Sequence, residues 1–161
     1  MKKSMAAFLV FIFMFLSVPF AHAKDSSEDM AGDFKLFSVS HKEYTLSSYK
    51  GKQPVLLFFW TTWCPFCQAE IKKMAGSKAQ ELADAGIEVL TINIGEPKDR
   101  VMKFLINHKI NLTVLLDENS SVSSAYSILG VPTFCLVDKQ GKIIFEENTF
   151  PENYKKLILG K

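Results

Sequence analysis

The most constraining feature of the sequence is an unbroken run of six apolar residues, Val55–Trp60 (VLLFFW). A strand with one buried face alternates apolar and polar residues, whereas a strand buried on both faces is apolar throughout. The run therefore predicts a central strand of a sheet that helices cover on both faces. Pro65 follows closely and suits the first turn of a helix, where its missing N–H costs nothing. We expect the strand to lead directly into a helix.

The rest of the chain continues this alternation of strands and helices. Apolar periodicity predicts a helix from Pro65 to Gly86, which Gly76 bends or weakens. Further elements are expected as hairpins at 33–46 and 132–146, a strand at 87–94, a short apolar piece at 113–116, a turn and short helix at 117–126, and helices at 97–107 and 150–159. This order predicts the α/β class. The mixed central sheet would be parallel on one side and antiparallel on the other, with helices on both faces.

The first 23 residues have the layout of a secretory signal. Two lysines precede an apolar run at 5–15, and the small-residue pattern AHA at 21–23 suits a cleavage site. The run is shorter than the roughly 20 residues that span a bilayer. We expect cleavage after Ala23 and export to a periplasmic or other extracytoplasmic location, with an uncleaved membrane anchor as the alternative. Residues 24–32 then form a polar tether, and residues 33–161 a single domain.

The charge balance excludes one class of partner. The chain has 19 basic and 17 acidic residues, and loss of Lys2 and Lys3 with the signal brings the formal net charge from +2 to zero. Acidic and basic residues are interspersed along the remaining chain. Because nucleic-acid binding requires a basic face, we expect no nucleic-acid partner.

Cys64 and Cys67 are two residues apart, a spacing with four interpretations. Haem attachment requires a histidine after the second cysteine, where Gln68 stands. Structural zinc requires two further ligands with a second paired spacing, which the sequence lacks, so no metal is expected. A purely structural disulfide would close a very small loop and stabilise the fold little. A redox-active dithiol at a strand-to-helix junction is the interpretation that remains.

The junction assigns a different role to each cysteine. Cys64 lies where the helix begins, so the unpaired N–H groups and the positive end of the helix dipole favour its thiolate, the nucleophile. Cys67 lies one turn later on the same side. It can attack a mixed disulfide formed at Cys64 and leave an internal Cys64–Cys67 disulfide. Cys135, on an expected strand, is interpreted as a small buried apolar residue.

Three motifs carry a family resemblance that covers nearly all of the chain after the signal. They are FWTTWCPFCQAEI, the preceding DFKLFSVSHKEYTLSSYKGK, and GVPTF far downstream. Together they resemble the thioredoxin superfamily, in particular its exported TlpA/ResA-like branch of thiol-disulfide oxidoreductases. The resemblance implies a thioredoxin-like fold with an N-terminal β-hairpin extension, and no cofactor.

The resemblance also implies roles for residues outside the cysteine pair. Pro132 matches the cis-proline of the family, which packs against the cysteines and leaves the backbone of Val131 to pair with an extended substrate. From the residues alone, a trans proline at a strand start is the alternative. Trp63 is either a contact surface for a partner or a packing residue at the helix entry, and we favour the contact surface.

Glu96 is the candidate for assisting the second cysteine. In the ResA-like branch, an acidic residue after this strand lies near that cysteine and assists its proton transfer. The alternative is an exposed carboxylate near a helix start. Cytosolic thioredoxins carry a buried aspartate two residues before the tryptophan of the core strand, where this chain has Phe58. Glu96 is therefore the better candidate here.

The leading functional hypothesis is an exported reductase of protein disulfides. The resemblance implies apocytochrome c as one such substrate, re-reduction by a membrane thiol-disulfide electron donor, and a monomer. A thiol peroxidase is one alternative, although the single arginine, Arg100, lies in a different segment from the cysteines. A copper-binding assembly module is another, although the sequence does not supply its wider cysteine spacing and histidine ligand.

Overall fold

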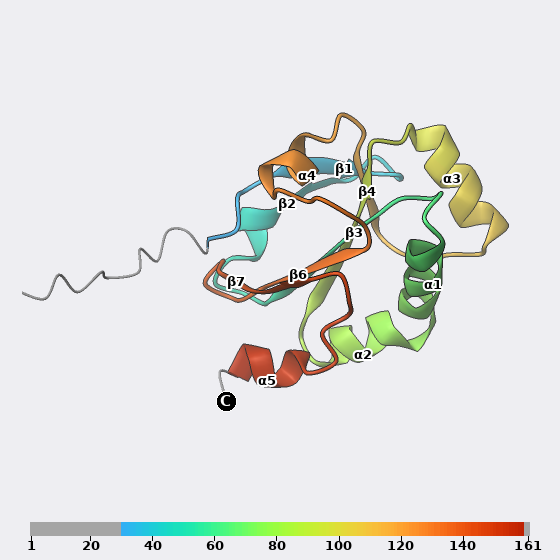
Figure 1. Cartoon of the computed structure of the whole chain (residues 1–161). Coiled ribbons are helices and arrows are strands. Elements are labelled where there is room, and N and C mark those ends of the chain that lie inside the picture. Colours follow the sequence, from blue (N-terminus) through green and yellow to red (C-terminus); the bar gives the residue numbers. More distant parts are fainter. Residues whose placement is uncertain (1–29, 160–161) are drawn as a thin grey trace, which may run out of the picture.

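The computed structural model describes residues 30–159, which form a single seven-stranded sheet with helices on both faces (Figure 1). The predicted signal and most of the predicted tether lie outside the described residues. The strands run in the order β2-β1-β5-β4-β3-β6-β7 across the sheet. They are β1 (Lys35–Ser38), β2 (Glu43–Thr45), β3 (Val55–Trp60), β4 (Glu88–Ile94), β5 (Val114–Asp117), β6 (Thr133–Val137) and β7 (Ile143–Glu147).

The sheet has the mixed character that the sequence predicts. Strands β3, β4 and β5 are parallel neighbours, and β6 and β7 continue the sheet antiparallel on the other side of β3. The hairpin of β1 and β2 is also confirmed, and β1 pairs antiparallel with β5. The apolar piece expected at 113–116 is therefore a strand that attaches the hairpin to the core. This fold is thioredoxin-like, as expected.

The helix expected from Pro65 to Gly86 is broken into two. It consists of α1 (Pro65–Lys73), a wider turn η2 (Met74–Lys78) and α2 (Ala79–Asp84), which meet at an angle in Figure 1. Gly76 has φ −79° and ψ −122°, a non-helical conformation. A residue without Cβ adopts it at low steric cost, so the break falls at the glycine.

The other expected helices lie close to their expected places. They are α3 (Lys98–Asn107), α4 (Ser121–Ala125) and α5 (Tyr154–Leu159). A 3₁₀ turn, η1 (Leu46–Tyr49), was not expected from the sequence. The final helix begins at Tyr154 and not at Phe150, because residues 151–153 form a turn in which the Tyr154 N–H donates to the Pro151 carbonyl (2.9 Å). The Phe150 ring instead packs against Phe134 of β6.

Strand β3 is buried on both faces, as its apolar run predicts. Phe58 and Trp60 pack with residues of α1, α2 and α3 on one face. Leu57 and Phe59 pack with residues of η1 and α4 on the other. Because successive side chains of a strand point to opposite faces, one strand contributes to both cores.

Replacing Phe58 by alanine tests this packing. The Phe58 ring is fully buried and stacks on Phe134 with centroids 4.6 Å apart. We expect Phe58→Ala to lower the free energy of unfolding by about 3–5 kcal/mol, since truncating a buried phenylalanine leaves a cavity. Urea denaturation measures the change. Phe37→Ala is the control because its side chain is 53% exposed, and a loss as large as that of Phe58→Ala would contradict the interpretation.

Candidate active site

The cysteine pair lies at the carboxyl end of β3, where the chain turns into α1 (Figure 1). Cys64 is the N-cap of α1, with extended backbone angles and Pro65 at the first helical position. Its Sγ accepts a hydrogen bond from the backbone N–H of Cys67 (3.3 Å). A sulfur at a helix N-cap is held by an N–H group that would otherwise lack a partner. The predicted strand-to-helix junction is therefore confirmed.

The two cysteines differ in burial. Cys64 is 5% exposed and Cys67 is fully buried, and both are free thiols in this structure. Burial, reinforced by the hydrogen bond with Cys64, raises the pKa of the Cys67 thiol to about 12. Cys67 is therefore protonated at neutral pH and closed to solvent, so Cys64 is the sulfur that an incoming disulfide can reach.

The antiparallel register of β3 and β6 brings Pro132 to the cysteines. Phe59 lies opposite Thr133, so the loop that precedes β6 meets the loop that follows β3. The Val131–Pro132 peptide bond is cis, which confirms the expected isomer. The Cys64 thiol donates to the carbonyl of Val131 (3.6 Å). Two of the predicted substrate-contact residues thus lie beside Cys64.

Trp63, the third predicted contact residue, lies on the surface. Its side chain is 67% exposed, so it does not pack into the helix entry as the alternative interpretation requires. A tryptophan that leaves most of its surface in water is available to a partner. The role itself stays a prediction.

Glu96 is buried, with 2% of its surface exposed, so the alternative of an exposed carboxylate is wrong. The parallel register pairs Trp60 with Asn93, which places Glu96 beside the loop after β3. Its Oε2 accepts the Thr62 N–H (2.6 Å) and the Asn93 side-chain amide (2.8 Å), and its Oε1 accepts the Thr62 hydroxyl (2.5 Å). The assistance to Cys67 stays a prediction, since these contacts are to the loop that precedes Cys64.

Thr62 and Gln68 are site residues that the sequence reasoning missed. Gln68 Nε2 donates to the carbonyl of Thr62 (2.8 Å), so the N–H, hydroxyl and carbonyl of Thr62 are all engaged. Arg100 approaches Glu96 from the outside, with 3.9 Å between Nη1 and Oε1. No local pattern signals these contacts, because Thr62 and Glu96 are 34 residues apart.

Cys135 lies on β6 in the core on the other face of the sheet from Cys64 and Cys67. It is fully buried, and burial raises the pKa of its thiol to about 12. This confirms its interpretation as a small buried apolar residue. Phe58, at the position of the thioredoxin aspartate, lies in the same apolar core as the active cysteines.

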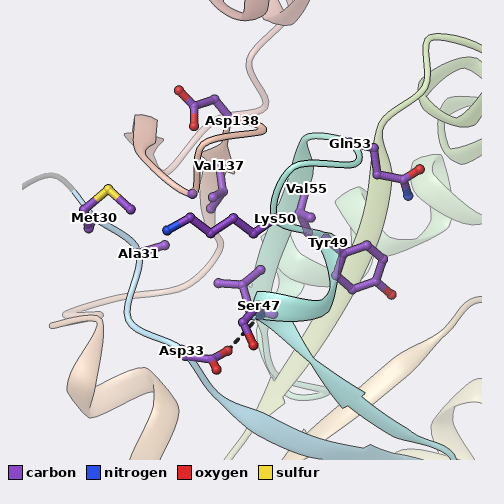
Figure 2. A pocket seen from close by; sticks show the side chains of 12 residues that line it. Met30, Ala31, Asp33, Ser47, Tyr49, Lys50, Gln53, Val55, Val137 and Asp138 are labelled. Atoms are coloured by element: carbon purple, nitrogen blue, oxygen red, sulfur yellow. Dashed lines mark hydrogen bonds between the residues drawn. The ribbon is translucent and has the colours of Figure 1, made fainter.

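A cavity of about 120 Å³ lies away from the cysteines, at the beginning of β3 (Figure 2). Val55 and Val137 are among its lining residues, and Lys50 extends across it toward Met30. None of its lining residues belongs to the cysteine site. Within residues 30–159, no group of three or more His, Cys, Asp or Glu side chains could hold a metal ion. None of the helices in this range is long and apolar enough to cross a membrane.

A family model described as the AhpC/TSA family matches residues 27–146, and the chain belongs to this family. The thiol-disulfide oxidoreductase ResA of Geobacillus thermodenitrificans is 36% identical over 130 residues, covering 81% of this chain and 67% of that protein. ResA of Bacillus subtilis is 35% identical over 114 residues, covering 71% and 63%. The chain thus spans about two thirds of the length of these relatives.

Solved structures agree with the sequence relatives. A protein from Chlorobium tepidum described as a thiol:disulfide interchange protein DsbE matches with a TM-score of 0.70 and 27% identity, covering 82% of this chain and 94% of that one. StoA from Bacillus subtilis matches with a TM-score of 0.67 and 22% identity, covering 80% and 98%, a likeness of fold. Fold, cysteine geometry and relatives together define a thioredoxin-like thiol-disulfide oxidoreductase.

Proposed function

We propose that this protein reduces disulfides of other exported proteins through Cys64 and Cys67. The thiolate of Cys64 attacks one sulfur of the substrate disulfide and displaces the other, which takes up a proton. Cys67 then loses its proton, attacks Cys64 and releases the second substrate thiol. Two electrons pass to the substrate, and the internal Cys64–Cys67 disulfide forms. The observation that carries the proposal is the order of burial, an N-cap sulfur backed by a buried thiol.

The reducing direction is the one that the family resemblance suggests. A strongly oxidising pair has a reduced form that is stabilised by positive charge beside its attacking thiolate. Residues 60–69, which include Cys64, contain no Lys, Arg or His that would stabilise that thiolate. The protein then requires a membrane thiol-disulfide donor to restore its dithiol. Apocytochrome c is the substrate that the resemblance suggests.

The other site residues act around this exchange in our proposal. Trp63, Val131 and Pro132 contact the substrate segment. Glu96 holds Thr62, and so it acts as a positioning residue for the loop that carries Cys64. We further propose that the chain is exported with cleavage after Ala23 and that it works as a monomer.

Cys67→Ser tests the two-step exchange. Without the resolving thiol, the mixed disulfide at Cys64 cannot be released by internal attack, so we expect covalent adducts to accumulate in the native compartment. Non-reducing electrophoresis followed by mass spectrometry identifies the trapped partners, and an apocytochrome among them would support that substrate.

The control for this trap is the double variant Cys64→Ser/Cys67→Ser, which lacks the attacking sulfur. It should form no adduct. Absence of dithiothreitol-sensitive adducts in Cys67→Ser, or equal adducts in the double variant, would show that Cys64 does not attack protein disulfides.

A further inference from the structure

Three large apolar side chains are exposed around the reactive sulfur. Trp63 is 67% exposed, Phe66 77% and Leu129 fully exposed. Trp63 and Phe66 flank Cys64 in sequence, and Leu129 precedes Val131, whose carbonyl accepts from the Cys64 thiol. Two residues of extended chain span at most about 7 Å, so Leu129 also lies close to the point of attack. These three side chains are called the apolar collar below.

Three hydrogen bonds fix the loop that carries Leu129. The Ile128 N–H donates to the carbonyl of Ser123 (2.9 Å), and the Thr133 hydroxyl donates to that of Gly130 (2.7 Å). Asn148 Nδ2 donates to the carbonyl of Pro132 (2.7 Å). Leu129 thus lies in a hydrogen-bonded loop, and its side chain is fully exposed. The fold gains no packing from this leucine, whereas a partner would meet a pre-organised apolar contact.

Charge sets a second condition on the partner. Residues 60–69, which include Cys64, and residues 127–137, which include the Val131 carbonyl that Cys64 contacts, contain no Asp, Glu, Lys, Arg or His. Leu129 also lines a surface hollow of about 200 Å³, and the exposed Glu146 and Glu147 line the same hollow. Acidic side chains of a bound segment would lose solvation at the apolar collar, and Glu146 and Glu147 would repel them.

We propose that the apolar collar selects disulfides in extended segments that carry apolar side chains beside the cysteine and no acidic ones. Leu129 is its specificity-determining residue. An extended segment directs alternate side chains to opposite sides, so it can lay one apolar side chain on Leu129 while its cysteine meets Cys64. Such segments belong to unfolded or incompletely folded chains, in which apolar residues next to cysteines are accessible. This inference rests on the proposed function and names the substrate class of the same site.

Rates of disulfide exchange with matched peptides test the apolar collar. Three peptides carry one cysteine as a mixed disulfide with a chromophoric thiol, flanked by leucines, serines or aspartates. The reduced protein should release the chromophore about tenfold faster from the leucine peptide than from the serine peptide, and slowest from the aspartate peptide. In Leu129→Ser, the leucine-to-serine ratio should fall to about two.

The matched control is Leu159→Ser, because Leu159 is 69% exposed and belongs to α5, a helix that lies apart from α1 in Figure 1. It should keep the ratio of the unchanged protein. Equal rates for the three peptides, or an unchanged ratio in Leu129→Ser, would overturn the role of the collar. A failure of the unchanged protein to reduce hydroxyethyl disulfide, which has no side chains to recognise, would overturn the proposed function instead.

Discussion

Cys64→Ser should lose disulfide reductase activity by at least about a thousandfold, because a serine hydroxyl cannot replace the attacking thiolate. Cys67 cannot substitute for it. Its thiol is fully buried and its pKa is raised to about 12, so at neutral pH it is neither ionised nor accessible. The rate of reduction of hydroxyethyl disulfide, followed at saturating external reductant, measures the loss.

Cys135→Ala is the control for this variant. Cys135 lies in the core on the opposite face of the sheet, so the substitution should cost stability through a small cavity and leave the exchange rate unchanged below the melting temperature. Retention of the full rate by Cys64→Ser would contradict the assignment of the attacking sulfur. Circular dichroism checks that both variants are folded during the assay.

Glu96→Gln should lower the free energy of unfolding by about 1–3 kcal/mol, because buried hydrogen bonds to a carboxylate are stronger than those to a neutral amide. The carboxyl group accepts three hydrogen bonds, two of them from Thr62. A glutamine amide has a single oxygen, which can still accept the Thr62 N–H and the Asn93 amide. Its NH₂ group then faces the Thr62 hydroxyl, which has to turn and accept in place of donating. The contact with Arg100 adds little, since it spans 3.9 Å and the arginine side chain is 63% exposed. Urea denaturation measures the change.

A second measurement on Glu96→Gln separates positioning from proton transfer. If Glu96 acts by holding Thr62, the exchange rate falls by a similar factor at every pH, and Thr62→Val reproduces part of the fall. A proton-transfer role would instead change the shape of the pH profile of the resolving step. Glu152→Gln is the control, because its side chain is 78% exposed and should cost less than about 0.5 kcal/mol.

Elements with strong local patterns were predicted well. The apolar run of β3 identified a strand buried on both faces, and Pro65 identified the start of α1 to the residue. Alternating residues located the β1–β2 and β6–β7 hairpins. Local signals failed where a contact distant in sequence decides the outcome. The helix expected from Phe150 starts at Tyr154 because the Phe150 ring packs against β6, and the apolar piece at 113–116 becomes a strand because β1 and β4 lie on either side of it.

The sequence by itself determined the chemistry of this protein: two cysteines one turn apart, ordered by the strand before them and the helix after them. Their residue types and spacing are local properties, and local geometry follows from them. The tertiary structure alone decided what surrounds the sulfur. Strand register brings Val131 to Cys64 from 67 residues away and Glu96 to Thr62 from 34. Contacts of this kind depend on how strands far apart in the chain pair, and pairing is settled by the packing of the whole sheet.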